Sequence, residues 1–238
     1  MGFATSDATL CELEVKNGIS YSFDRQTVTD LLSVIKSHFS VSLRELTLSS
    51  LPLESTHGGA SSPLHPIPVF ALRNLHTVRI STPSRIALSN EDLYTITSAW
   101  ANLVSLHIRW SAGDSVVVAR PTLDCLPRIA RSCPNLRVLY VSSMDLTFAA
   151  GLDTYPILSH HLDYLGIQST SDRQKIDVVD VALFLDRLFP FLDAKMLRHL
   201  YEQRDREGQT SLARVYHQLQ GFHAVRMQDR KRMLSRTL

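Results

Sequence analysis

One apolar pattern recurs along the chain and limits the folds that are open to it. The pattern is Leu-x-x-Leu-x-Leu, with Val or Ile allowed at the later positions. Its six copies begin at Leu10, Leu43, Leu75, Leu103, Leu136 and Leu162. The second and third apolar positions lie two residues apart, so both point to the same face of a short strand. One copy cannot bury that face alone, whereas stacked copies bury a continuous core beneath a parallel sheet.

The spacing of the copies indicates the type of repeat. Their starts are separated by 33, 32, 28, 33 and 26 residues. Leucine-rich repeats have periods of roughly 20–29 residues, and longer ones when the return segment is a full helix. We therefore expect an α/β fold over residues 1–200: a leucine-rich-repeat solenoid, with a curved parallel sheet and helices on its convex side.

The first return segments carry helical patterns. One set of apolar residues falls at helical spacing: Val28, Leu31, Leu32, Ile35 and Phe39. Ser89 followed by Asp92 is the signature of a capping box, and apolar residues continue from it at helical spacing as far as Trp100. These patterns predict a helix in each segment.

Two later helices are expected after Thr122 and after Asp177. The first must hold Pro127 in its first turn or begin later than Thr122, because proline lacks the N–H that a helix interior needs. The second should stop before Pro190. Residues 57–68 and 142–161 are rich in helix-breaking residues, so we expect irregular connections there.

The C-terminal segment, residues 201–238, is predicted to be a charged stretch followed by a capping helix. A degenerate seventh strand is expected before it, near Met196 and Leu197. Apolar residues of the helix recur every three or four positions: Leu212, Val215, Leu219, Phe222 and Val225. A repeat array needs such a cap over its last core face. Two other interpretations are that the basic face of this helix docks an acidic partner or touches a membrane surface. The basic face consists of Arg226, Arg230, Lys231, Arg232 and Arg236.

Composition excludes several classes of protein. The net charge of +2 is too small to favour nucleic acid as a partner. No apolar run approaches the ~20 residues of a membrane span. The three cysteines form no Cys-x-x-Cys pair, so neither a disulfide framework nor a zinc site is expected, and a reducing compartment, the cytoplasm or nucleus, fits best. We expect no cofactor.

Three stretches carry a family resemblance. Residues 98–106 read SAWANLVSL, residues 129–139 read IARSCPNLRVL, and residues 181–190 read VALFLDRLFP. They resemble the runs AWPxLxxL, IAxxCPxLxxL and VAxFLxxLFP in the leucine-rich-repeat region of F-box-like proteins, particularly the divergent ones of basidiomycete fungi. Ala101 stands where proline is usual.

The resemblance implies a substrate receptor of a cullin-type ubiquitin ligase, in which the F-box binds an adaptor subunit and the repeats hold the substrate. We find no F-box segment here, because Leu10 to Val15 already resemble a repeat strand. Two explanations stay open. The chain is a fragment with an F-box upstream, or it is a relative without the ligase connection.

The concave face of the expected sheet is the predicted site of binding. Side chains that alternate with the core residues must face it. Tyr and Arg dominate binding energy at interfaces. We therefore predict a central contact patch for a protein partner: Arg79, His107, Arg109, Tyr140 and Tyr164. The alternative is that these are ordinary solvated positions of a sheet.

No residue pattern points to catalysis. Cys125 and Cys133 are expected to be packing residues. His160 and His161 are adjacent and have no acidic or cysteine partner at ligand spacing, so we expect no metal site. The favoured function is a protein-binding module without enzymatic activity. The alternatives are a repeat scaffold or inhibitor with no ubiquitin link, and an enzyme with its site in the loops around His57 or Tyr155.

Overall fold

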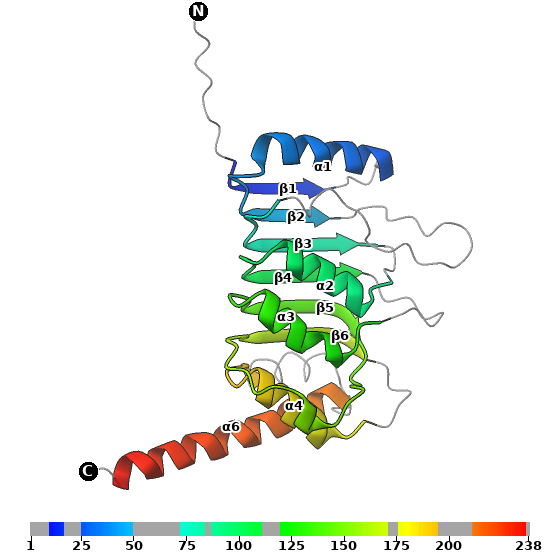
Figure 1. The fold of residues 1–238 in the computed structure, drawn as a ribbon. Coiled ribbons are helices and arrows are strands. Elements are labelled where there is room, and N and C mark those ends of the chain that lie inside the picture. Colours follow the sequence, from blue (N-terminus) through cyan, green and yellow to red (C-terminus); the bar gives the residue numbers. More distant parts are fainter. Residues whose placement is uncertain are drawn as a thin grey trace, which may run out of the picture.

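Six parallel strands form one sheet whose order follows the chain, from β1 to β6 (Figure 1). The structure is a computed structural model and describes residues 10–16, 25–49, 72–83, 87–110, 120–170, 176–194 and 211–236. The strands are β1 (Glu12–Lys16), β2 (Glu45–Ser49), β3 (Thr77–Thr82), β4 (Ser105–Trp110), β5 (Val138–Met144) and β6 (Tyr164–Thr170). Each copy of the apolar pattern supplies one strand, so the α/β class is confirmed.

The register of the sheet aligns equivalent residues of every copy. The second apolar positions are direct neighbours across the six strands, and so are the third. From β2 to β6 these side chains are at most 4% exposed, whereas Leu13 and Val15 of the edge strand β1 are only partly buried. A slip of one residue would turn every one of them to the other face, so the burial pattern fixes the pairing.

Backbone hydrogen bonds join the copies at the corner before each strand. The carbonyl of Arg44 accepts from the N–H groups of His76, at 2.7 Å, and Thr77, at 3.1 Å. The equivalent carbonyl bonds the next copy in the same way at each step from β1 to β6. One further bond, from the N–H of Asp193 to the carbonyl of Asp163, continues the series beyond β6. The predicted strand at Met196 and Leu197 lies outside the described residues.

A second corner geometry recurs where helices end. Trp100, Cys133 and Phe189 each follow a helix with φ between −130° and −124° and ψ between 66° and 75°. Three residues later a buried leucine donates its N–H to the carbonyl of that residue, over 3.0–3.1 Å. These corners lie within or directly after the three stretches that carry the family resemblance.

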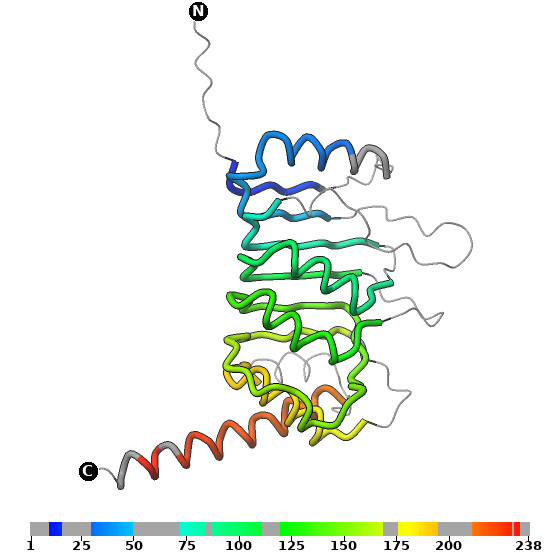
Figure 2. The backbone as a smooth tube through the Cα atoms, viewed as in Figure 1, coloured from blue at the N-terminus to red at the C-terminus, as the bar shows by residue number. Residues whose placement is uncertain are grey.

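Helices pack against one face of the sheet and beyond its two ends (Figure 1). They are α1 (Arg25–Phe39), α2 (Asn90–Ala99), α3 (Leu126–Ser132), α4 (Val178–Leu188) and α6 (Ser211–Arg236). The backbone trace shows α2 and α3 in front of the strands, while α4 and α6 lie beyond β6 (Figure 2). Buried side chains of these helices and of the strands belong to one hydrophobic core.

The helix starts follow the predicted capping chemistry. Ser89 and Asp92 form the capping box of α2, with the Asp92 N–H donating to the Ser89 hydroxyl over 3.2 Å. The Asp177 carboxylate caps α4. Pro127 lies in the first turn of α3, where its missing N–H costs no hydrogen bond, and α3 begins at Leu126 rather than Thr122, after the short 3-10 helix η2 (Leu123–Cys125).

The prediction of an irregular connection over residues 142–161 is wrong for its first residues. Strand β5 continues to Met144, and Ser142 is 3% exposed. A buried serine is tolerated here because its hydroxyl accepts from the N–H of Trp110 at 2.9 Å. Farther along, η3 (Leu152–Thr154) is a single short turn. The other expected irregular connection, residues 57–68, lies outside the described residues.

The first half of α6 closes the core beyond β6, as predicted for a capping helix. Leu212, Val215 and Leu219 are buried, and α6 packs against α4. The prediction is wrong for Val225, which is 57% exposed. Toward its C-terminal end the helix projects beyond the rest of the fold (Figure 1). The expected domain boundary at residue 200 lies outside the described residues.

Two contacts hold α6 in place. Tyr216 is fully buried and donates its hydroxyl to the carbonyl of Leu165 in β6 at 2.7 Å. Arg226 bonds the Asp186 carboxylate of α4 and the carbonyl of Pro190. At least part of the predicted basic docking face is therefore engaged within the molecule. Within the described ranges, no helix combines the length and apolar character needed to cross a membrane.

Candidate binding surface

The face of the sheet opposite α2 and α3, here called the open face, brings the five predicted contact residues together. Arg79, His107 and Tyr140 are consecutive partners in one row across β3, β4 and β5. Arg109 lies two residues along β4, and Tyr164 pairs with Val138 at the start of β6. Because alternate residues of a strand share a face, all five project to the same side. We call these five residues the open-face patch.

Tyr140 is the centre of the open-face patch. Its ring stacks on the His107 ring, with centroids 5.9 Å apart and planes at 15°. The Arg109 guanidinium lies 5.5 Å from the Tyr140 ring centroid, within the range of a cation–π interaction. The Tyr140 hydroxyl donates to Oε1 of Gln168 over 3.2 Å. Three contacts therefore fix this ring before any partner arrives.

Gly166 leaves space for both tyrosine rings. It pairs with Tyr140 across β5 and β6. A Cβ at this position would lie 2.4 Å from Cδ2 of Tyr140 and 2.7 Å from Cε1 of Tyr164, closer than real contacts allow. The rings thus lie over the glycine backbone. Sequence reasoning gave Gly166 no role, although a glycine inside a repeat strand was the available signal.

Positive charge gathers on β3 and β4. Arg79 lies 3.9 Å from the Glu45 carboxylate of β2, and both side chains are about half exposed, so this ion pair contributes little. Burial, and then the charges of Arg79 and Arg109, lower the pKa of His107 from its ordinary value. His107 is consequently neutral at pH 7, and the two arginines carry the charge.

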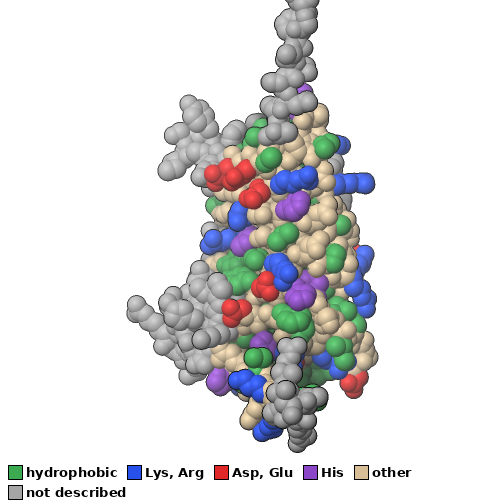
Figure 3. Space-filling model, turned by 90° about the vertical axis from the view of Figure 1, so that its left-hand side faces the viewer, with side chains coloured by type: hydrophobic (Ala, Val, Ile, Leu, Met, Phe, Trp, Pro, Cys, Tyr) green, Lys and Arg blue, Asp and Glu red, His purple; other side chains and the backbone are tan. Residues whose placement is uncertain are grey.

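The open face changes character from strand to strand. Glu12, Glu14 and Glu45 give β1 and β2 acidic side chains, and the arginines follow on β3 and β4. Tyrosines follow on β5 and β6. By contrast, the side of the molecule where the strands begin carries basic, acidic and histidine side chains interspersed (Figure 3). Ser142, two residues beyond Tyr140 on β5, is buried as described above.

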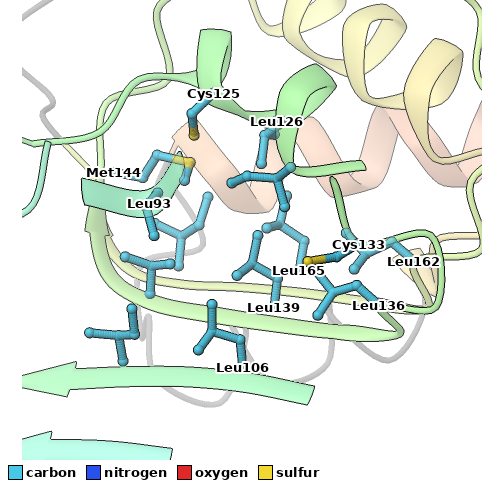
Figure 4. Packing of buried hydrophobic residues seen from close by; sticks show 14 of the residues in the cluster. Leu93, Leu106, Cys125, Leu126, Cys133, Leu136, Leu139, Met144, Leu162 and Leu165 are labelled. Carbon is cyan, nitrogen blue, oxygen red and sulfur yellow. The ribbon is translucent and has the colours of Figure 1, made fainter. Parts of the chain in front are cut away.

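Cys125 and Cys133 are packing residues, whereas Cys11 is exposed. Cys125 and Cys133 lie among leucines and Met144 in the core (Figure 4). Burial raises the pKa of Cys133 to about 12 and raises that of Cys125 further. Both thiols therefore stay protonated at neutral pH, so neither is an activated nucleophile.

The adjacent histidines point to different neighbours. His160 is buried, with Nε2 2.9 Å from the carbonyl of Cys133, whereas the His161 ring stacks on Phe191 with centroids 4.2 Å apart. In the part of the chain that the structure describes, no three His, Cys, Asp or Glu side chains are arranged to hold a metal ion.

Comparison with known proteins adds no assignment. No protein-family model matches this chain, and no curated protein matches it significantly.

Proposed function

We propose that this chain is a leucine-rich-repeat solenoid that binds another protein on its open face, the concave side of the array, and carries out no chemistry of its own. The observation that carries the proposal is the open-face patch itself. Five residues from β3 to β6 converge on the face that α2 and α3 leave uncovered.

The repeat architecture is supported by two recurring features. The apolar pattern supplies all six strands in one register, and the corner hydrogen bonds repeat from each copy to the next. Such one-dimensional stacking is the organisation of leucine-rich-repeat arrays, whose curvature creates a concave binding surface.

Binding is supported by the chemistry and rigidity of the open-face patch. Arg and Tyr side chains dominate the energy of protein interfaces. The Tyr140 ring is already held by His107, Arg109 and Gln168, so less conformational entropy is lost when a partner docks. A preorganised aromatic centre with basic neighbours suits recognition of a protein surface.

A narrower version of the proposal follows from the family resemblance: the chain recruits substrates to a cullin-type ubiquitin ligase. The corners at Trp100, Cys133 and Phe189 show that the three resembling stretches have equivalent local structure, which supports the repeat family. The alternative is a scaffold or inhibitor without a ubiquitin link. Both versions place the protein in the cytoplasm or nucleus, where its thiols stay reduced.

The experiment is affinity capture with the full chain from cells that express it, scored by mass spectrometry. The test variant is Arg109→Glu with Tyr140→Ala, and the control is Arg131→Glu, the same charge change at an exposed residue of α3. We expect the test variant to lose its main captured proteins at least tenfold while the control keeps them. Full retention by the test variant would refute binding at the open face. Adaptor and cullin subunits among the captured proteins would support the ligase version.

A further inference from the structure

Arg109 is an exposed cation of the open-face patch. In the described part of the chain its guanidinium makes no hydrogen bond or ion pair, and it lies over the Tyr140 ring, 5.5 Å from the centroid. Building on the function proposed above, we infer that Arg109 binds one carboxylate side chain, Asp or Glu, on the surface of the partner protein, and that His107 takes up a proton as this ion pair forms.

The charges near Arg109 favour a single carboxylate. Arg79, the other arginine of the open-face patch, lies 3.9 Å from the Glu45 carboxylate. Those two charges offset each other, which leaves the positive charge of Arg109 on this part of the open face. One carboxylate balances that charge, whereas a phosphate group carries nearly two negative charges and exceeds it. A carboxylate bound here accepts charge-assisted hydrogen bonds from the guanidinium, which are stronger than neutral ones.

The Tyr140 ring prepares Arg109 for this role. Tyr140 is itself held by the His107 ring, with centroids 5.9 Å apart, and by its 3.2 Å bond to Gln168. A guanidinium over the face of a ring keeps N–H groups at its edge, where a planar carboxylate can accept from two of them. Exposed ion pairs usually contribute little, in part because two long side chains lose conformational freedom. The stacked rings already restrict Arg109, so less freedom is lost when the carboxylate binds.

His107 links this ion pair to pH. The charged and aromatic groups that face its ring are Arg79 of β3, Arg109 of β4 and Tyr140 of β5, with Glu45 of β2 beyond Arg79. Burial, followed by the charges of Arg79 and Arg109, holds the pKa of His107 below its ordinary value. A carboxylate on Arg109 offsets one of these charges and therefore raises the pKa of His107. Because the bound state then holds more protons, the affinity for the carboxylate must increase as the pH falls.

The acidic strands β1 and β2 favour a protein partner over single-stranded nucleic acid, which also binds basic and aromatic surfaces. A polyanion that crossed the open face from Arg109 would bring its phosphates over Glu12, Glu14 and Glu45. A protein that presents one carboxylate at Arg109 avoids that repulsion.

The test selects peptides on the full chain from a displayed library of random 12-residue sequences. Peptides that also bind the Tyr140→Ala variant are removed, which discards binders of other surfaces without selecting for charge. The tightest remaining peptide is synthesised together with versions in which each Asp or Glu is changed to Asn or Gln. Fluorescence polarisation measures their affinities. We expect one acidic position whose neutral replacement weakens binding to the native chain at least about fivefold.

A double-mutant cycle locates the ion pair without relying on the fold of any one variant. Arg109→Gln should remove the difference between the acidic peptide and its neutral version, and Arg131→Gln on α3 should leave that difference unchanged. A peptide with Lys at the acidic position should bind the Arg109→Glu variant more tightly than it binds the native chain.

The proton uptake is measured with the same acidic peptide. Its affinity for the native chain should rise at least about twofold from pH 7.5 to pH 6.0, and a single proton limits the rise to about tenfold per pH unit. The peptide carboxyl, with an ordinary pKa of about 4, stays ionised over this range. His107→Gln should abolish the rise, and NMR of the His107 ring should show a higher pKa with the peptide bound.

Several results would overturn the inference: no recovered peptide that depends on Tyr140, no acidic position coupled to Arg109, an affinity that does not depend on pH through His107, or tighter binding at the same site of a phosphoserine peptide or a ten-nucleotide oligouridine RNA. The outcome also separates this inference from the proposed function. If the affinity-capture variant loses its captured proteins but no acidic position couples to Arg109, the carboxylate inference fails and protein binding stands. If that variant keeps all captured proteins, both fail.

Discussion

Replacing Gly166 by alanine is expected to disturb the open-face patch from beneath. The added Cβ would lie 2.4 Å from Cδ2 of Tyr140, 2.7 Å from Cε1 of Tyr164 and 2.9 Å from the Tyr164 hydroxyl. Contacts this short do not persist, so one or both rings must move. The aliphatic core beneath the strands lies on the other face of the sheet, although Tyr164 also packs against the core, so the perturbation should centre on the two tyrosine rings.

The magnitude can be worked out from the contacts that Tyr140 would lose. Its stack on His107, its contact with Arg109 and its bond to Gln168 together contribute roughly 1.5–4 kcal/mol. Alanine also restricts the unfolded chain, which offsets about 0.4–1 kcal/mol of this loss. We therefore expect Gly166→Ala to lower the free energy of unfolding by about 1–3 kcal/mol.

The assay is urea unfolding followed by tryptophan fluorescence, with Gly221→Ala as the matched control. Gly221 is exposed within α6, and a Cβ there meets nothing within 4 Å. That substitution should raise stability by about 0.5–1 kcal/mol, because glycine disfavours a helix interior. If Gly166→Ala proved as stabilising as Gly221→Ala, and nuclear Overhauser contacts between His107 and Tyr140 persisted, the glycine would not be what positions the rings.

Three further predictions concern stability. Ser89→Ala removes the hydroxyl that accepts from the Asp92 N–H and should lower the unfolding free energy by about 1 kcal/mol, measured by urea titration; an unchanged midpoint would contradict it. Tyr216→Phe removes the 2.7 Å bond to Leu165 and should cost about 0.5–1.5 kcal/mol in the same assay, and no loss would show that the hydroxyl does not hold α6. Burial lowers the pKa of both His107 and His160 in the folded chain. As the pH falls, the unfolded state therefore binds protons at these histidines before the folded state does. The free energy of unfolding should decrease as the pH drops from 7.5 through about 6.5 to 5.5. Thermal melting across that range checks the sign, and His160→Asn should reduce the slope.

The capping helix illustrates what periodicity can and cannot predict. Spacing alone identified Leu212, Val215 and Leu219 as the inward face of α6, and all three are buried. Spacing also included Val225, which is 57% exposed even though the next residue, Arg226, still bonds Asp186 of α4. Tyr216 escaped notice because its buried position depends on the carbonyl of Leu165, an acceptor 51 residues away.

The amino-acid sequence alone determined the strands, their order and their register. A residue period of two assigns each side chain to a face, and equal patterns in successive copies bury the most apolar surface when they align. That same rule placed Arg79, His107, Arg109, Tyr140 and Tyr164 on one face. Tertiary structure decided which of those side chains touch, since contact depends on neighbouring strands that are distant in sequence. The space above Gly166 and the burial of Ser142 against Trp110 exist only once β4, β5 and β6 lie side by side.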